Sequence, residues 1–315
     1  MVDLFNSFII IIGLIVFEAI NSIDNAIVNA YVLKSMSEKW RKIFLFWGML
    51  FAVFVIRGAL PFLMVWLTIP GIGFGQAFAA MFSSSHEAAA AIEAGRPLLL
   101  MGAGVFLMLL YLHWLFLEEK KPLFAADKLM KPQYGIWFFA FSAVILVSLL
   151  YFARDNPMLM LSAAIGNAAF FILYGFREQA EKQSVRLMEK AGSMGDLSKF
   201  LYLEVLDASF SFDGVFGAFA FTTSIPLILI GNGIGAFIVR EMTIKSVDRI
   251  AKYRFLKNGA MTSIGFLGAV IVIESFGIEL PEFLPTLVML SFVGVAFYES
   301  RKFLKNNSDN LKTEN

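Results

Sequence analysis

Two segments far apart in the chain place acidic residues in one pattern within otherwise apolar stretches. Each has an acid, three residues, a serine, one residue, an aspartate, and then Asn or Gly. The residues that carry the pattern are Glu18, Ser22, Asp24 and Asn25 in the first segment, and Asp207, Ser211, Asp213 and Gly214 in the second. Because a charge at bilayer depth costs about 2.5 kcal/mol or more, two matched clusters of charge predict a binding site for cations.

The residue types in these segments indicate which cation would bind. Glu204, three residues before Asp207, adds a fifth carboxylate. The available donors are carboxylate, amide and hydroxyl oxygens, which favour Mn²⁺, Mg²⁺ or Ca²⁺ over zinc or copper. We expect no prosthetic group, only this ion, bound or transported. The predicted ligands are Glu18, Asp24, Asn25, Glu204, Asp207, Ser211 and Asp213, with Asn21, Ser22, Arg57 and Arg240 in support.

Two arginines within apolar runs could balance part of this charge. Arg57 follows Gly48 by nine residues, and Arg240 follows Gly231 by nine residues. If the acids only formed ion pairs that fix the helices together, five carboxylates against two arginines would leave three negative charges uncompensated. A divalent cation with a proton would neutralise that remainder, since clustered acids raise one another's pKa. Arg240 stands near the end of its apolar run, so reaching out to the interface is an equally good interpretation for its side chain.

The composition excludes several classes of protein. The chain has 315 residues, of which 58% are apolar, more than a soluble domain carries. Its net charge of +1 gives no indication of a nucleic-acid partner. The absence of cysteine removes disulfides, Cys-ligated zinc and iron–sulfur clusters. The remaining partner is the lipid bilayer, and the sequence does not indicate an oligomeric state.

Apolar runs of about 20 residues, long enough to cross a bilayer, predict an all-helical membrane protein with nine spans. Residues 4–33 are long for one crossing, and the polar stretch from Asn21 to Asn25 suggests a broken helix. A second break between Ser211 and Gly214 would turn Asp213 into the same cavity. The expected spans are 4–33, 43–67, 98–117, 134–152, 158–175, 200–222, 226–244, 259–277 and 284–303.

The distribution of basic residues predicts the orientation. Of 26 Lys and Arg residues, 22 fall in alternate loops and the tail, whereas Arg96 and Arg154 lie in the opposite loops. By the excess of positive charge expected on the inner side, the N-terminus is outside and the C-terminus is cytoplasmic. The first acidic motif then lies in span one and the second in span six, so the two halves have opposite orientations.

An inverted repeat of this kind places a substrate site near the midplane. We expect residues 1–152 to form the first repeat, 153–199 a linking span with a cytoplasmic helical loop, 200–304 the second repeat, and 305–315 a disordered cytoplasmic tail. Segment 68–97, which contains three glycines, is interpreted as a solvated outer loop, with a short interfacial helix as the alternative.

The chain resembles the TerC-like family of integral membrane proteins, which is related to the LysE transporter superfamily. The matching stretches are Glu18 to Asn25 and Leu203 to Asp213, and the second, with its continuation to Ala220, is similar to a TerC-related subgroup known as a domain of unknown function. The resemblance implies export of manganese or a related divalent cation across the bacterial plasma membrane. One departure is Gly214, which stands where the first motif has Asn25.

We therefore expect a secondary transporter, most simply an exporter of divalent metal ions, rather than an enzyme. A non-transporting factor for membrane-protein assembly is the main alternative, although the longest inner loop, 176–199, offers little soluble surface for a partner. An intramembrane aspartyl enzyme is a weaker alternative, because paired catalytic aspartates would here lack their usual sequence context.

Overall fold

The computed structural model describes residues 4–48, 50–56, 58–59, 62–63, 66, 71–82, 86–129, 135–190, 195–245 and 252–313, and the regular structure in these residues is helical. The first half holds α1 (Leu4–Asn21), α2 (Ile23–Lys34), α3 (Glu38–Ile43), the π-helical turns η1 (Phe44–Gly48) and η2 (Phe51–Ile56), α5 (Phe74–Phe82), α6 (His86–Leu117), α7 (Ala125–Leu129) and α8 (Ile136–Phe152). The second half holds α9 (Pro157–Lys190), α10 (Asp196–Ala218), α11 (Ile225–Lys245), α13 (Leu256–Ser275) and α14 (Leu284–Thr313).

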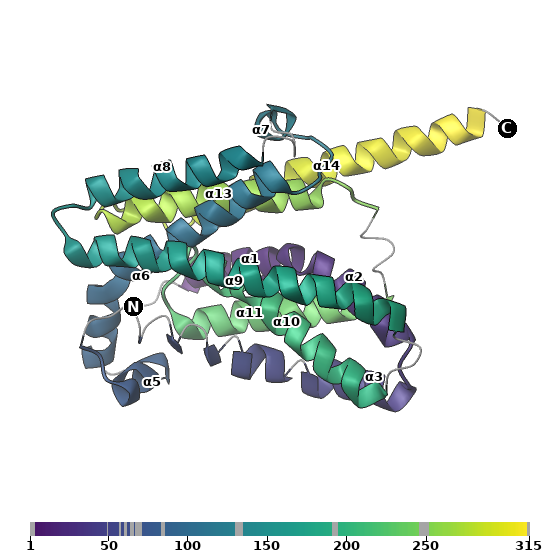
Figure 1. The fold of residues 1–315 in the computed structure, drawn as a ribbon, viewed down its shortest axis with the longest axis horizontal. Coiled ribbons are helices and arrows are strands. Elements are labelled where there is room, and N and C mark those ends of the chain that lie inside the picture. The colour runs from purple at the N-terminus through teal and green to yellow at the C-terminus, as the bar shows by residue number, and fades with distance from the viewer. Residues whose placement is uncertain are drawn as a thin grey trace.

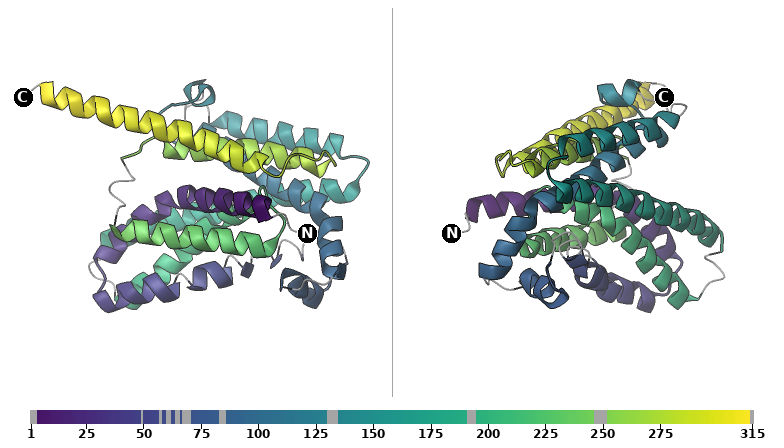
Figure 2. Two further views of the ribbon diagram at one scale, coloured as in Figure 1. Left: turned by 180° about the vertical axis from the view of Figure 1, so that it is seen from behind. Right: turned by 60° about the vertical axis from the view of Figure 1, so that its left-hand side comes forward.

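The helices form a bundle in which α6 is central. Figure 1 shows α8, α13 and α14 along one side of the molecule and α10, α11 and α3 along the other. Helix α6 packs against α13, α9, α8 and α10, and α1 packs mainly against α11 and α14. The views in Figure 2 show α1 and α11 side by side, with the end of α14 projecting beyond the bundle.

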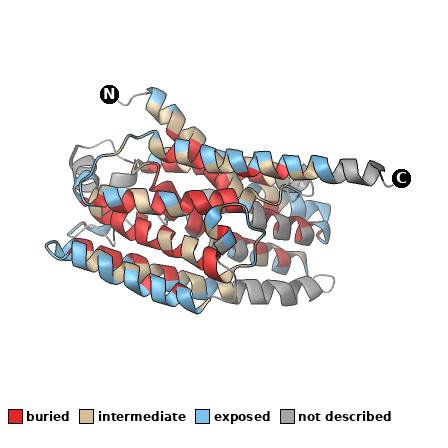
Figure 3. Ribbon diagram, turned by 90° about the horizontal axis from the view of Figure 1, so that it is seen from above, coloured by how far each residue is buried: buried red, intermediate tan, exposed pale blue. Residues whose placement is uncertain are grey.

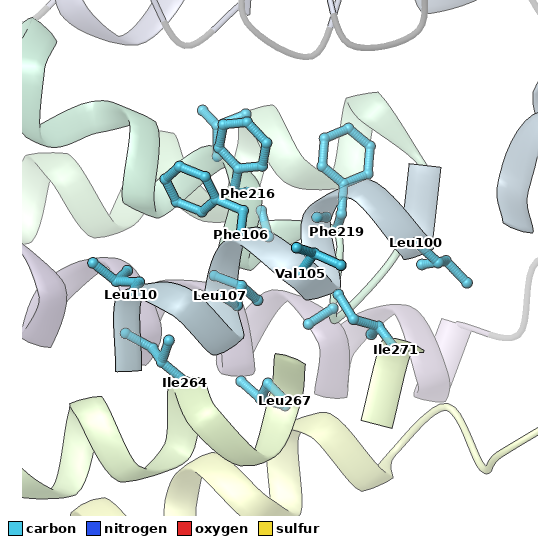
Figure 4. Close-up of a cluster of buried hydrophobic side chains, with 14 of the residues drawn as sticks. Leu100, Val105, Phe106, Leu107, Leu110, Phe216, Phe219, Ile264, Leu267 and Ile271 are labelled. Carbon is cyan, nitrogen blue, oxygen red and sulfur yellow. The ribbon is translucent and has the colours of Figure 1, made fainter. Parts of the chain in front are cut away.

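The core lies where α6, α10 and α13 meet. Figure 4 shows apolar side chains from all three helices pointing into one cluster. The rings of Phe106 and Phe216 stack with their centroids 4.0 Å apart, joining α6 to α10. Among membrane helices such association depends on close packing, for which small residues are needed. Accordingly, a methyl group at Gly104 would lie 3.0 Å from the Gly268 carbonyl oxygen, and one at Gly166 would collide with the Gly102 carbonyl.

Many large apolar residues are exposed on the outer surface, and Figure 3 colours the exposed residues of every type pale blue along the ribbon. Within the described residues, four helical segments have the length and apolarity to cross a membrane: Leu4–Asn21, Glu93–Leu117, Pro157–Phe176 and Leu256–Ser275. Helix α8 is equally apolar but has only 17 residues. These segments indicate a membrane protein, and the count of nine spans stays a prediction.

Three boundaries differ from those expected. Segment 68–97 is not a loop where the structure describes it, because it contains α5 and the first turns of α6, which continues through Pro97. Helix α9 continues from its apolar part to Lys190, so the expected cytoplasmic helix is an extension of a span. Helix α14 continues to Thr313, so the expectation of a disordered tail from residue 305 is wrong in this structure. Each extension has a simple cause, since an existing helix lengthens by one hydrogen bond per residue without a new nucleus.

The two acidic motifs differ in backbone conformation. Helix α1 ends at Asn21 and α2 begins at Ile23, with Ser22 between them at ψ 3°, so the break expected in the first motif is confirmed. The break expected in the second motif is wrong, because α10 runs without interruption from Asp196 to Ala218. Gly214 and Gly217 sit against α1, so they allow a close approach of two helices rather than a bend.

Candidate cation site

Glu18 from the first motif is enclosed by two helices of the second half. Its side chain is buried, with 1% of its surface exposed. Ser22, four residues on and therefore on the same face, donates a hydrogen bond from Oγ to Glu18 Oε1 at 2.6 Å. A methyl group at Gly214 of α10 would lie 2.9 Å from Glu18 Oε2, and one at Gly235 of α11 would lie 2.6 Å from Glu18 Cβ. The two glycines thus leave space for the Glu18 side chain, Gly214 beside its carboxylate and Gly235 beside its stem.

The contacts of the glycines also give the relative direction of the helices. Along α10, Gly214 faces Glu18, Gly217 faces Phe17, and Phe221 lies against Gly13. The numbers rise on one helix as they fall on the other, so α1 and α10 are antiparallel. The two acidic motifs therefore lie against each other where Glu18 meets Gly214.

Helix α11 runs in the opposite sense to α10 along α1. A methyl group at Gly231 would lie 2.5 Å from Leu14 Cβ, and Gly235 faces Glu18, so the numbers rise together. Helices α1 and α11 are consequently parallel. This register places Gly231, which precedes Arg240 by nine residues, against α1, the helix that carries Glu18 of the first motif.

A second group of charges lies further along α10 toward its N-terminus. Arg240 Nη2 is 4.0 Å from Glu204 Oε1 and 4.0 Å from Asp207 Oδ2, and the three side chains are largely buried. The guanidinium also lies over the ring of Phe44, 4.4 Å from its centroid, and donates a hydrogen bond to the Phe44 carbonyl oxygen. The interpretation that Arg240 reaches outward to the interface is therefore wrong, because its partners lie inside the bundle.

Glu204 is buried with its charge poorly compensated. It is 6% exposed, and neither of its carboxylate oxygens makes a hydrogen bond to a described residue. Its Oε1 occupies the place where a methyl group at Gly48 would stand. Gly48 thus makes room for a carboxylate of the other half. A buried carboxylate without hydrogen bonds is costly.

The serines of the two motifs have different roles. Ser22 donates to the carboxylate of Glu18, whereas Ser211 donates from Oγ to the backbone oxygen of Asp207 at 2.7 Å. Asp207 and Asp213 are both buried, at 8% exposed. The matching sequence patterns therefore orient their hydroxyl groups differently.

An apolar cluster with polar contacts at its edge lies at the N-terminal end of α10. It contains Val32, Leu33, Met36, Phe44 and Leu203, which join α2 and η1 to α10. Lys199 Nζ donates to the Ser35 carbonyl oxygen at 2.8 Å, and Ser37 Oγ donates to Asp196 Oδ2 at 2.5 Å. We call these two hydrogen bonds, from α10 to the corner between α2 and α3, the corner contacts.

Three of the predicted residues lie, wholly or by their side chains, outside the described part of the structure. The side chains of Asp24 and Asn25, and the whole of Arg57, lie outside the described part of the structure. Asn21 Nδ2 would be 3.9 Å from a methyl group at Gly214, beside Glu18. Within the described residues, no three acids, histidines or cysteines converge closely enough to hold a metal ion. The described acids instead lie at two levels of α10: Glu18 lies against Gly214, the residue after Asp213, and Glu204 and Asp207 lie beside Arg240.

The sequence interpretation missed three residues that belong here. Phe44 and Lys199 were counted only as part of an apolar run and a basic loop, and their roles depend on contacts between distant segments. Asn232 is 1% exposed on α11 and was not singled out as a candidate from the sequence. A helical wheel of α11 would have found it, because it falls among the apolar positions of one face.

Comparison with known proteins gives a family without an assigned activity. A family model described as "Protein of unknown function (DUF475)" matches residues 23–308, which include all of the second motif and the end of the first. No curated protein and no solved structure matches the chain.

Proposed function

The chain belongs to the DUF475 family of proteins of unknown function, and from its buried acids we propose that it is a secondary transporter of divalent metal cations, with Mn²⁺ favoured. The ion would be held by carboxylates of the two acidic motifs. The observation that carries the proposal is the meeting of these motifs across one interface, with Glu18 enclosed by α10 and α11.

The burial of four acids supports a cation as their ligand. Glu18, Glu204, Asp207 and Asp213 are all buried, and Arg240 lies 4.0 Å from the carboxylates of Glu204 and Asp207. Removing a carboxylate from water costs several kcal/mol by order of magnitude unless a counter-charge is present. A bound divalent ion, together with protons, supplies that charge.

The arrangement of the helices supports alternating access between two inverted halves. Helices α1 and α10 are antiparallel, as oppositely oriented repeats require. Contacts between other helices also come in related pairs: α1 contacts α13, and α10 contacts α6. Gly48 of the first half lies against Glu204, and Gly231 of the second half lies against Leu14. Transporters built this way bind substrate at the repeat interface.

The choice of ion follows from the donors. Hard oxygen ligands without thiolate favour Mn²⁺, Mg²⁺ or Ca²⁺. The direction proposed, export from a bacterial cell, is the one that the resemblance to the TerC-like family implies. The two groups of acids are separated along α10 by six or seven residues, about 10 Å, so the ion would pass from one group to the other.

The test is metal accumulation in cells challenged with MnCl₂, combined with thermal unfolding of the purified protein with and without the metal. We expect Asp213→Asn and Glu18→Gln to abolish both protection of the cells and stabilisation by Mn²⁺. The matched control is Asp155→Asn, the same chemical change at a side chain that is 95% exposed. If the two site variants behave like the control, the ion site is assigned wrongly. A protein that no divalent ion stabilises would instead support the assembly factor.

A further inference from the structure

Asn232 is a buried amide whose polar atoms have no partner in the described part of the chain. It is 1% exposed, and neither Oδ1 nor Nδ2 makes a hydrogen bond to a described residue. A buried amide that forms no hydrogen bond has lost its water without compensation, which favours an apolar residue at that position. Its presence therefore calls for a partner that the described residues do not supply.

The side chain lies at the centre of the inward face of α11. Buried positions recur along this helix with the helical period, and exposed Ile230, Ile234 and Phe237 mark the opposite face. The buried positions are Ile225, Ile228, Gly231, Asn232, Gly235, Ala236 and Val239. The helices in contact with α11 include α1, α2, α10 and η2, so its inward face meets the helices that carry both acidic motifs.

The register along α1 places Asn232 just beyond Glu18. Gly231 lies against Leu14 and Gly235 against Glu18, and the two helices are parallel, so Asn232 is level with Ile15. It therefore stands one helical turn from Glu18, on the side away from the Arg240 group. In the proposed orientation that side leads to the outside of the cell.

We propose that Asn232 Oδ1 is a further ligand for the divalent cation, at the outer end of the path that continues through Glu18. This inference rests on the proposed function and adds to it a neutral oxygen donor from a third helix. An amide oxygen is an ordinary ligand for hard divalent cations. Because it adds no charge, it binds the ion without retaining it as strongly as a carboxylate, which suits a position where the ion is released.

The experiment compares two isosteric substitutions of buried polar residues, Asn232→Leu and Thr262→Val. Thr262 of α13 is also buried, and its Oγ1 likewise makes no hydrogen bond to a described residue, so it is the matched control. Thermal unfolding of each purified protein is measured over a titration with MnCl₂. We expect Asn232→Leu to raise the metal-free midpoint and to weaken the apparent Mn²⁺ affinity at least tenfold. Thr262→Val should leave the Mn²⁺ affinity unchanged.

A second variant keeps the test informative if the leucine protein does not fold. Asn232→Asp retains an oxygen donor and adds a charge, so it should bind Mn²⁺ at least as tightly as the unaltered protein while transporting it more slowly. Unchanged Mn²⁺ affinity in Asn232→Leu, or lost affinity in Asn232→Asp, would overturn the assignment. If Asp213→Asn loses the Mn²⁺ response and Asn232→Leu keeps it, only this inference fails. If the unaltered protein has no response, the proposed function fails with it.

Discussion

The packed core around α6 and the acidic interface around α1 use glycine for different purposes. In the core, Gly166 lies against the carbonyl of Gly102. A methyl group added at Gly104 would lie 3.0 Å from the carbonyl oxygen of Gly268. These glycines bring backbones together. At the acidic interface, Gly214 and Gly48 lie against the side chains of Glu18 and Glu204 instead. They make room for carboxylates, so the same residue type gives rigidity in one region and space for charge in the other.

The largest effect should come from enlarging a core glycine. In Gly166→Ala the new methyl group collides with the backbone of α6, which has no flexible end to move away. Overpacking of this kind costs about 3 kcal/mol, and the better helix propensity of Ala returns about 1 kcal/mol. We therefore expect a net loss of about 2 kcal/mol in the free energy of unfolding, by denaturant titration in detergent. A stability equal to that of the unaltered protein would show that α6 and α9 are not in backbone contact.

An intermediate effect should come from Lys199→Met, at the edge of the acidic interface. Methionine keeps the apolar stem but cannot donate to the Ser35 carbonyl. A hydrogen bond from a charged group contributes about 1.5–3 kcal/mol, offset in part by burial of the charge, so we expect a loss of about 1 kcal/mol. Hydrogen exchange should then increase at the backbone of the corner between α2 and α3, but not in α13. An equal increase of hydrogen exchange in α13 would mean that losing the Lys199 hydrogen bond destabilises the whole bundle rather than the corner alone.

The smallest effect on stability, and the sharpest contrast with Gly166→Ala, should come from Gly214→Ala. The methyl group would meet the end of the Glu18 side chain at 2.9 Å, and that side chain can shift. The cost of about 1 kcal/mol from overpacking is matched by the gain in helix propensity of about 1 kcal/mol. We expect nearly unchanged metal-free stability with Mn²⁺ affinity reduced several-fold, by titration of the purified protein. If stability falls as far as in Gly166→Ala, the two regions do not differ in the way proposed.

Much of the fold could be predicted from apolar runs, because each run long enough to cross a bilayer becomes a helix wherever the structure describes it. The polar stretch after Glu18 also predicted the break at Ser22. Helix ends were predicted poorly, since α6, α9 and α14 continue through polar residues. Sequence polarity ends a span, but it does not end a helix whose next residue can still form its hydrogen bond.

The acids could be singled out from the sequence, but their surroundings could not. The shared motif pointed to Glu18 and Asp213, both of which are buried, whereas the expected meeting of Asp24 with Asp213 falls on a side chain outside the described part of the structure. The partners of Arg240 could not be predicted, because Phe44 and Glu204 reach it from distant segments. The unbroken α10 was missed for a related reason. Whether a glycine bends a helix or admits a neighbour depends on what packs against it.

The continuity of α10 has a mechanical consequence. Asp196 and Lys199, in its first turn, hold the corner between α2 and α3, and the same rigid rod carries Asp213 more than three turns later. A tilt imposed at this corner would therefore be passed along α10 toward this carboxylate. The facing segment consists of helices α1 and α2, which are separated at Ser22. The first motif would therefore take up such a tilt by bending at Ser22, whereas the second motif would move with α10.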